Sequence, residues 1–277
     1  MGSLDLLRAR LVVQTGIKAQ AQLAGLWQQW GDLIWWQTEL GAVAANLVLH
    51  SGFQVESVQV QRLAALMKWQ QRPAGWLVWP DQAAEYLQPA LLANGFYHCE
   101  NIKLLSAAAE NLSIKRLSTN IFISHESENI IQPLGLNQQH LFSEFLVNCH
   151  AIPNSFAHVV AEAFLAQKLT ESPAINLDCA PVFSNWAVYQ AGKPVASITA
   201  CLLKDKSQLI GGLLWLGTLA EWRRMGFARQ LAAHACGWLL ANGVNFVYVQ
   251  SSRAAIQLYL DLGFQENGNL ELWNWWP

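Results

Sequence analysis

The residues with the clearest chemical potential lie in one stretch, residues 208–230, which reads QLIGGLLWLGTLAEWRRMGFARQ. An uncharged, mainly apolar run breaks at Gly217, and Arg223, Arg224 and Gly226 follow just before a second apolar segment. This order predicts a buried strand that leads into the N-terminus of a helix. Such a junction presents unpaired backbone N–H groups and the positive end of a helix dipole, which together favour an anion, above all a phosphate. Because Gly226 has no Cβ, a pyrophosphate can approach the backbone there.

Three common motifs do not fit this stretch. A P-loop requires G-x-x-x-x-G-K followed by Ser or Thr, and Gly226 is not part of one. The dinucleotide fingerprint requires three glycines after the first strand of a βαβ unit, whereas a single glycine stands here and antiparallel hairpins are predicted before it. A serine nucleophile elbow, G-x-S-x-G, is absent. What remains is R-x-x-G-x-A at Arg223, Gly226 and Ala228, between a strand and a helix.

The sequence around this stretch predicts the elements that position it. Alternating apolar residues on either side of Ala191-Gly192 predict a β-hairpin, and the strand of the motif comes third in the same sheet. The helix after the motif buries Phe227, Leu231, Ala235, Trp238 and Leu239 and ends at Asn242-Gly243. The predicted order is strand 120–124, helices 137–148 and 153–168, strands 182–189, 194–203 and 209–219, the motif helix, strand 245–250, helix 252–262 and strand 264–274.

The N-terminal half shows a similar order. We expect helices over 4–28, 55–72 and 81–93, and strands at 32–39, 43–50, 75–79 and 96–105, with Pro89 kinking or dividing the third helix. The polar segment 107–115 is interpreted as a domain linker. A strand GWLVW and a helix ending in LLANGF correspond to NFVYVQ and YLDLGF near the C-terminus. This correspondence predicts an internal duplication, the alternative being two unrelated α/β units.

Two motifs together resemble the GCN5-related N-acetyltransferases (GNAT). The acyl-CoA pyrophosphate loop of that family is Q/R-x-x-G-x-G/A, and Arg223 to Ala228 fits it, with Glu221-Trp222 where Glu-Tyr is common and Ala220 in place of the usual proline. A second signature, Asn followed by A-x-x-L-Y and L-G-F, is similar to residues 252–264, with Ser252 in place of Asn. Its matching residues are Ala255, Leu258, Tyr259, Leu262, Gly263 and Phe264.

The resemblance implies a fold and a domain organisation. The fold is α/β (α+β), with a mixed, mostly antiparallel central sheet flanked by helices, the acyl-CoA N-acyltransferase fold, here duplicated. The expected domains are residues 1–115, a degenerate GNAT-like N-terminal domain, and residues 118–277, a GNAT acetyltransferase domain. The N-terminal copy has no R-x-x-G-x-A before its corresponding strand, so we do not expect it to bind CoA.

The resemblance also implies how acetyl-CoA is bound as acyl donor. The strand splays from its neighbour, and its free backbone groups bind the pantetheine arm like an added strand, while backbone N–H groups after it hold the pyrophosphate. A strand N–H near Thr218 polarises the thioester carbonyl. Ser252 either contacts CoA or caps its helix, and the cap is the favoured interpretation. The implied cofactor-binding residues are Leu216, Gly217, Thr218, Arg223, Arg224, Met225, Gly226, Phe227, Ala228, Arg229 and Ser252.

The resemblance implies a general acid but no general base. Tyr259 is the expected general acid that protonates the departing thiolate, against the alternative of a tyrosine packed on the inner face of its helix. Many GNAT members use a glutamate on the splayed strand as general base, but this strand offers Trp215, Leu216 and Thr218. Ionisable residues in the segments expected near the acceptor are more typical of surface charge, and a water chain is the other route. These residues are Glu144, His158, Glu162 and Asp178.

The composition argues against nucleic acid, membrane and metal as partners. A net charge of -2 and 13% charged residues provide no basic field for nucleic acid. No apolar run reaches the roughly 18 residues that span a bilayer, and the N-terminus lacks the apolar core of a signal peptide. Five scattered cysteines predict a reduced, cytoplasmic protein. A monomer or homodimer is expected. No metal site is expected, and the adjacent Cys149 and His150 are interpreted as ordinary helix residues.

Two functions stay open at this point, and a third is weakened. The first is an acyl-CoA dependent N-acetyltransferase that acts on a primary amine of a small molecule or peptide. Direct attack of the amine on the thioester is expected, with an unidentified, partly apolar acceptor suggested by the many aromatic residues. The second is a catalytically silent acyl-CoA or metabolite binding module of the same fold. The third, tRNA-dependent aminoacyl transfer, is weakened by the acidic charge and the intact CoA motif.

Overall fold

The computed structural model describes residues 3–21, 25–31, 33–50, 57–80, 84–114, 131–165 and 181–277. Within these residues eleven strands form one continuous sheet in the order β1-β2-β3-β4-β11-β5-β10-β9-β8-β7-β6. The strands are β1 (Leu26–Trp30), β2 (Leu33–Gln37), β3 (Leu47–His50), β4 (Ala74–Val78), β5 (Tyr97–Ala108), β6 (Ile131–Pro133), β7 (Val182–Gln190), β8 (Lys193–Asp205), β9 (Gln208–Thr218), β10 (Phe246–Ser251) and β11 (Gln265–Trp275).

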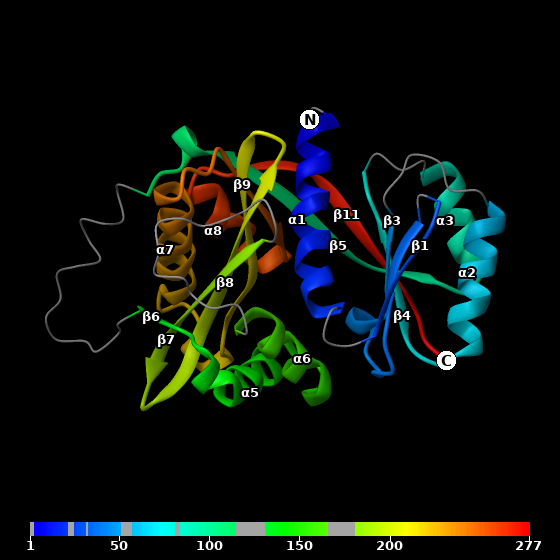
Figure 1. Ribbon diagram of the computed structural model, residues 1–277, viewed down its shortest axis with the longest axis horizontal. Coiled ribbons are helices and arrows are strands. Elements are labelled where there is room, and N and C mark those ends of the chain that lie inside the picture. The colour runs from blue at the N-terminus through cyan, green and yellow to red at the C-terminus, as the bar shows by residue number, and fades with distance from the viewer. Residues whose placement is uncertain are drawn as a thin grey trace, which may run out of the picture.

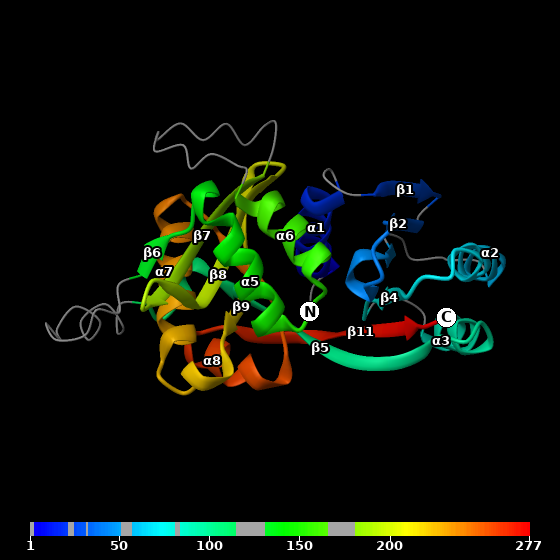
Figure 2. The same ribbon diagram turned by 90° about the horizontal axis from the view of Figure 1, so that it is seen from below.

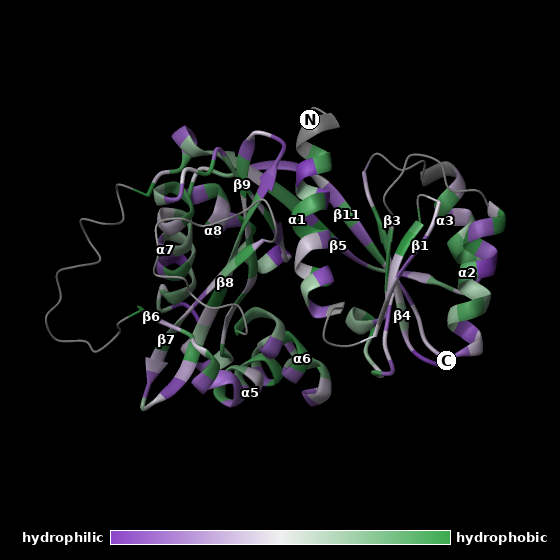
Figure 3. Cartoon of the chain, viewed as in Figure 1, coloured by the Kyte–Doolittle hydropathy of each residue, from purple (hydrophilic) through white to green (hydrophobic). Residues whose placement is uncertain are grey.

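Helices cover both faces of this sheet (Figure 1). They are α1 (Ser3–Ala21), α2 (Ser57–Trp69), α3 (Ala84–Ala93), α5 (Gln139–His150), α6 (Asn154–Leu165), α7 (Phe227–Ala241) and α8 (Ile256–Asp261). Short 3-10 turns occur at η1 (Val43–Ala45), η2 (Ala109–Asn111), η3 (Leu136–Gln138), η4 (Ala220–Trp222) and η5 (Arg253–Ala255). Strands β8 and β9 are mainly hydrophobic, whereas β5 and β11 and the outer side of α2 carry many hydrophilic residues (Figure 3).

The two halves of the chain repeat the same element order. The first half runs α1, β1, β2, β3, α2, β4, α3, β5, and the second runs α6, β7, β8, β9, α7, β10, α8, β11. When these elements are matched, the strand order from β1 to β7 reads the same from either end. The parallel pair β3–β4 corresponds to the parallel pair β9–β10, and the other pairs are antiparallel. The predicted duplication is therefore confirmed in the topology, with a pseudo-twofold relation centred on β5 and β11.

The halves exchange their last strands. β5 of the first half lies between β10 and β11, pairing Ser251 of β10 with Lys103. β11 of the second half lies between β4 and β5, pairing Trp273 with Trp76. Both views show these two long strands running across the molecule from one half to the other (Figures 1 and 2). The strand predicted at 264–274 is thus present as β11, and it pairs with β4 and β5 of the first half.

Several local predictions need correction. The first helix ends at Ala21, and Leu26–Trp30 form β1 instead of extending it. Only Leu47–His50 of the expected strand 43–50 is extended, because Val43–Ala45 form η1. Pro89 lies inside α3 without dividing it, and a kink there stays a prediction. The edge strand β6 was not predicted, and Trp238 is only partly buried. The strand expected at 120–124 lies outside the described residues.

The segment interpreted as a linker is largely structured. Ala107 and Ala108 belong to β5, and Ala109–Asn111 form η2. The Ser113 N–H donates to the Leu262 carbonyl at 3.0 Å, which ties this segment to the second half. The polar residues Glu110, Asn111 and Ser113 are exposed in and just after η2, whereas Ala107 and Leu112 are buried. The domain boundary at residues 115–118 stays a prediction.

Candidate functional site

Strands β9 and β10 diverge at the end that carries the motif. They pair in parallel from Ile210–Phe246 to Leu213–Val249, and no pairing follows although both strands continue. Beyond that point β9 keeps its antiparallel partner β8, as far as Thr218 opposite Ala196. One edge of residues 214–218 is consequently not paired with β10. The expected splay next to Leu216, Gly217 and Thr218 is present.

A bulge shapes the diverging end of β9. The register with β8 shifts between Thr199–Leu214 and Ser197–Gly217, so β9 carries one extra residue there. Trp215 lies in this bulge with a φ of 51°, a left-handed conformation that is uncommon for a bulky residue. Bulges bend a strand and redirect its side chains. The indole of Trp215 thereby reaches the face of the sheet that carries α5 and α6, where it packs edge-on to Phe156.

The loop before α7 has the backbone shape of an anion site. Arg224 has a φ of 67° and Gly226 a φ of 86°, so two left-handed residues stand just before the helix. Gly226 is the N-cap of α7 and provides no side chain, and the first intrahelical bond runs from the Gln230 N–H to the Gly226 carbonyl. The earliest N–H groups of a helix have no partner within it and point outward at this end. Met225 is exposed, whereas Phe227 anchors the helix in the core at 2% exposure.

The three arginines near this loop differ in their contacts. Arg223 Nε donates to the Thr218 carbonyl at 3.1 Å, which holds its side chain back along the end of β9. Arg229 Nη1 forms an ion pair with Asp261 Oδ2 at 3.1 Å, so its charge is partly compensated. Arg224 is exposed. All three arginines therefore lie at the surface around this turn, and Arg224 faces solvent. Ala228 lies half-buried in the first turn of α7.

Tyr259 of α8 is buried at 2% exposure, and its ring packs edge-on to Phe264 with centroids 5.4 Å apart. Burial, with a smaller contribution from Cys236, raises the pKa of Tyr259 well above its usual value. The phenol therefore stays protonated at neutral pH, and it is a weaker acid than an exposed tyrosine. Tyr259 also lines the cavity described next, so the position fits both the general-acid and the packing interpretations.

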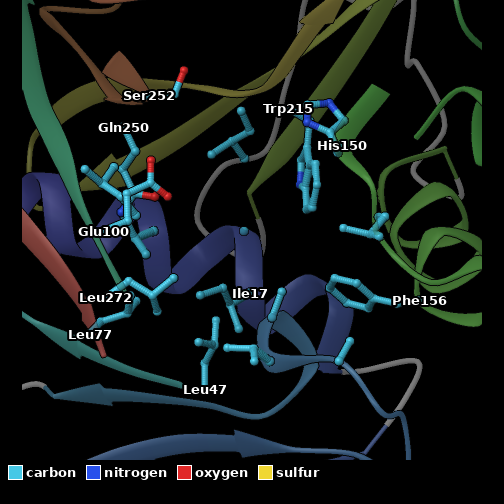
Figure 4. A pocket seen from close by; sticks show the side chains of 18 of the residues that line it. Ile17, Leu47, Leu77, Glu100, His150, Phe156, Trp215, Gln250, Ser252 and Leu272 are labelled. Carbon is cyan, nitrogen blue, oxygen red and sulfur yellow. The ribbon is translucent and has the colours of Figure 1, made fainter. Parts of the chain in front are cut away.

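A cavity of about 720 Å³ opens at the divergence of β9 and β10. Its walls come from both halves of the chain: α1 and η1 with neighbouring strands from the first, and the α5–α6 turn, β9, β10, α8 and β11 from the second. Figure 4 shows Ile17, Leu47, Leu77 and Leu272 forming an apolar wall, with Ser252, Gln250 and Glu100 gathered on one side. His150 and Trp215 lie together on another side (Figure 4).

Ser252 is exposed and lines this cavity. It occupies the N-cap of η5, and its carbonyl accepts the Ala255 N–H at 3.0 Å, but its side chain makes no capping hydrogen bond. The favoured interpretation of Ser252 as a side-chain cap is therefore wrong, because only its backbone carbonyl accepts a hydrogen bond at this helix end. Contact with a bound ligand stays a prediction.

Cys149 and His150, which the sequence predicts to be ordinary helix residues, lie against the end of β9. A Cβ added to Gly217 would overlap Cys149 Sγ and would lie 2.8 Å from His150 Nε2. Burial raises the pKa of the Cys149 thiol to about 11, so it is a poor nucleophile at neutral pH. Burial lowers the pKa of His150 to about 4, which keeps the imidazole neutral. A glycine within an apolar strand was the available signal, since it marks a close approach by another group.

The other ionisable candidates are not brought to the cavity. Glu144 and His158 are exposed, and Glu162 is half-buried on α6, and none of them lines the cavity. Asp178 lies outside the described residues. Glu100 is the one carboxylate among the lining residues. No group of three or more possible metal ligands occurs in the part of the chain that the structure describes.

Comparison with known proteins decides the family of the second half. Residues 154–264 match the family model described as Acetyltransferase (GNAT) family. This segment is a GNAT domain. It begins at α6 and ends at Phe264, so it contains the diverging strands, the R-x-x-G-x-A loop and Tyr259. The resemblance inferred from the two sequence motifs is confirmed. A search of the curated proteins finds no match.

Solved structures extend the likeness beyond the GNAT domain. A GCN5-related N-acetyltransferase from Kribbella flavida is 14% identical with a TM-score of 0.56, over 94% of this chain and 95% of that chain. A tandem GNAT protein from the clavulanic acid biosynthesis pathway is 10% identical with a TM-score of 0.57, over 83% and 74%. The glucosamine N-acetyltransferase region of a fungal multi-domain GH3 β-N-acetylglucosaminidase is 13% identical with a TM-score of 0.62, over 98% and 37%. At these identities the matches establish the fold, which is the tandem acyltransferase fold predicted from the sequence.

Proposed function

We propose that the protein is an acetyl-CoA dependent N-acetyltransferase that acts on a primary amine of a small molecule or peptide. One observation carries this proposal: β9, which diverges from β10, contributes Leu213–Leu216 to a cavity that Tyr259 also lines and then leads into the left-handed turn at Arg224 and Gly226. A linear molecule with a phosphate end and a thioester end fits that path. The GNAT domain at residues 154–264 supports the same activity.

The residues fit acetyl-CoA part by part. The turn at Arg224 and Gly226 leaves open space, since the nearest atom to a Cβ on Gly226 would be Gln230 Nε2 at 3.9 Å. Backbone N–H groups of residues 224–229 would hold the pyrophosphate there. The edge of Leu216–Thr218 that β10 leaves unpaired offers backbone groups to the pantetheine amides, as an added strand would. Ser252, which follows β10, would contact the same arm.

The chemistry requires one bond to form and one to break. A neutral amine attacks the thioester carbonyl carbon, and the carbon–sulfur bond breaks as the amide forms. Alignment of the two reactants supplies much of the rate. Backbone N–H groups near Thr218 would stabilise charge on the carbonyl oxygen, and the protonated phenol of Tyr259 would donate its proton to the departing sulfur.

The cavity lining favours a partly apolar acceptor. Its walls include Ile17, Leu47, Phe156 and Leu272, and Glu100 is its single carboxylate. A polyamine would require several acidic partners. An amine attached to an aliphatic or aromatic body is therefore the acceptor class that we propose.

A catalytically silent binding module of the same fold is the second candidate. The observation that favours it is the absence of any carboxylate on β9, where Gln208 to Thr218 carries no ionisable residue. This candidate predicts acetyl-CoA binding without acyl transfer.

Two measurements separate these functions. Acetyl-CoA at about a hundred times its Kd should stabilise the folded state by about 2.7 kcal/mol, visible as a raised Tm. If acetyl-CoA does not raise the Tm, both functions are wrong. Release of free thiol is then followed across a panel of arylalkyl and alkyl primary amines and peptides. Release above the hydrolysis rate supports the enzyme, and binding without release supports the silent module.

Cellular location and assembly complete the proposal. Among the described residues no helix is long and apolar enough to span a membrane. Cys99, Cys149, Cys201 and Cys236 are free thiols. A cytoplasmic monomer or homodimer is the state that we propose, and fractionation with light scattering would test it.

A further inference from the structure

His150 occupies a fixed position beside the predicted thioester site. It is the last residue of α5, and Ala151 follows with a left-handed φ of 52° that turns the chain away. The His150 ring lies edge-on to the indole of Trp215, with centroids 5.2 Å apart and an interplanar angle of 87°. Because Nε2 would lie 2.8 Å from a Cβ on Gly217, it stands next to the backbone of the segment proposed to hold the thioester. Figure 4 shows His150 and Trp215 together at the cavity wall.

The Nε2 atom of His150 is buried and has no hydrogen-bond partner among the described residues. A buried polar nitrogen without a partner costs free energy, and most such atoms in folded proteins are satisfied. His150 also lines the cavity. An unpartnered nitrogen at a cavity wall is the arrangement expected of a group whose partner belongs to a ligand.

We propose that His150 accepts the proton of the attacking amine, an inference that rests on the proposed acetyl transfer. As the amine nitrogen bonds to the carbonyl carbon, its N–H proton passes to Nε2 of His150. The carbon–sulfur bond breaks, and the sulfur takes the Tyr259 proton. The products are the amide and the free thiol, and the imidazolium and phenolate then exchange protons with solvent. His150 supplies the base that β9 does not carry.

The surroundings of His150 suit this role. From α5 it meets Phe145 and Cys149, and from β9 it meets Trp215 and Gly217. Arg223 is the nearby charge, acting on the neighbouring Cys149. Burial lowers the pKa of His150 to about 4, so its lone pair is available throughout the neutral range. It is a weak base, but an amine becomes a stronger acid as its nitrogen bonds to carbon, which lets a weak base take the proton.

The test uses chemical rescue of the full chain. His150→Ala and His150→Gln are assayed for thiol release from acetyl-CoA with 2-phenylethylamine, and for acetyl-CoA hydrolysis, in which water is the acceptor. Loss of a general base should lower both rates about 10²–10⁴-fold. Tm shifts with acetyl-CoA should match the wild type, which separates loss of the base from loss of donor binding. His158→Ala, an exposed histidine on α6, is the matched control and should be unchanged.

Free imidazole should restore activity to His150→Ala, with a rate that rises across imidazoles of increasing basicity. A cavity-filling effect would instead follow the size of the added molecule and not its basicity. Wild-type rates in both histidine variants, or no rescue by any imidazole, would overturn the role of His150. Failure of acetyl-CoA to raise the Tm of the wild type would overturn the proposed function itself.

Discussion

The side chain of Val12 packs directly on the backbone of Gly212, where an added Cβ would overlap Val12 Cγ1. Val12 belongs to α1 of the first half and is 2% exposed, whereas Gly212 lies in β9 of the GNAT domain. Gly212 pairs with Tyr248 of β10 just before these strands diverge. The first half therefore contacts the strand that carries the proposed site.

Gly212→Ala should destabilise the protein. The added methyl group has no room unless α1 moves, and overpacking of this kind costs about 1–3 kcal/mol. Gly237→Ala in α7 is the matched control, because no atom lies within 4 Å of its added Cβ. There, alanine should stabilise the helix by about 0.5–1 kcal/mol. Urea unfolding measures both changes, and equal effects of the two substitutions would contradict the packing of α1 on β9.

Gly226→Ala should weaken acetyl-CoA binding. Alanine at a φ of 86° is strained by about 1–2 kcal/mol and shifts the turn that would hold the pyrophosphate. Gly192→Ala carries a similar strain at a φ of 78° in the β7–β8 turn, where an added Cβ meets no atom. Both variants should lose stability, but only Gly226→Ala should raise the Kd for acetyl-CoA in calorimetric titration. Equal Kd values in the two variants would show that the phosphate does not bind at this turn.

Tyr259→Phe should slow catalysis without loss of donor binding. Removing the phenol proton should lower thiol release about 10²–10⁴-fold if Tyr259 is the general acid. Tyr248→Phe, another buried tyrosine at 2% exposure, is the control and does not line the cavity. Steady-state thiol assays with equal acetyl-CoA occupancy compare the two. Full activity in Tyr259→Phe would favour the packing interpretation.

Stability should depend on pH through His150. The pKa of the imidazole is about 6.5 in the unfolded chain and about 4 in the folded protein, so between these values the unfolded state binds more protons. Stability therefore falls as the pH drops from 6.5 to 4, by about 3 kcal/mol from this residue. His150→Phe lacks this contribution. Urea unfolding at pH 7 and pH 4 should show a smaller loss in the variant, and identical losses would contradict burial of a neutral ring.

The turn of the proposed site was predictable because its signals are local. Gly226 and Asn242-Gly243 bound α7, and Ala191-Gly192 forms the predicted hairpin turn with two left-handed residues. Apolar spacing within one strand or helix determines which face is buried, so β9 and α7 follow from their own residues.

His150 was not predictable because it reaches the site through tertiary packing. Adjacent residues on a helix point in different directions, which argued against a paired role for Cys149 and His150. They nevertheless both contact Gly217, since they form the last turn of α5 and β9 has no side chain there. The left-handed backbone of Trp215 was equally unpredictable from the sequence, because tryptophan rarely adopts that conformation.

The exchange of β5 and β11 ties the timing of folding to translation. The first half leaves the ribosome early, yet β4 keeps a free edge until Glu271–Trp275 have been synthesised. An unpaired strand edge is a template for association with other chains. A nascent chain that stalls before β11 would therefore present this edge to neighbouring chains, and aggregation of the first half is the expected result.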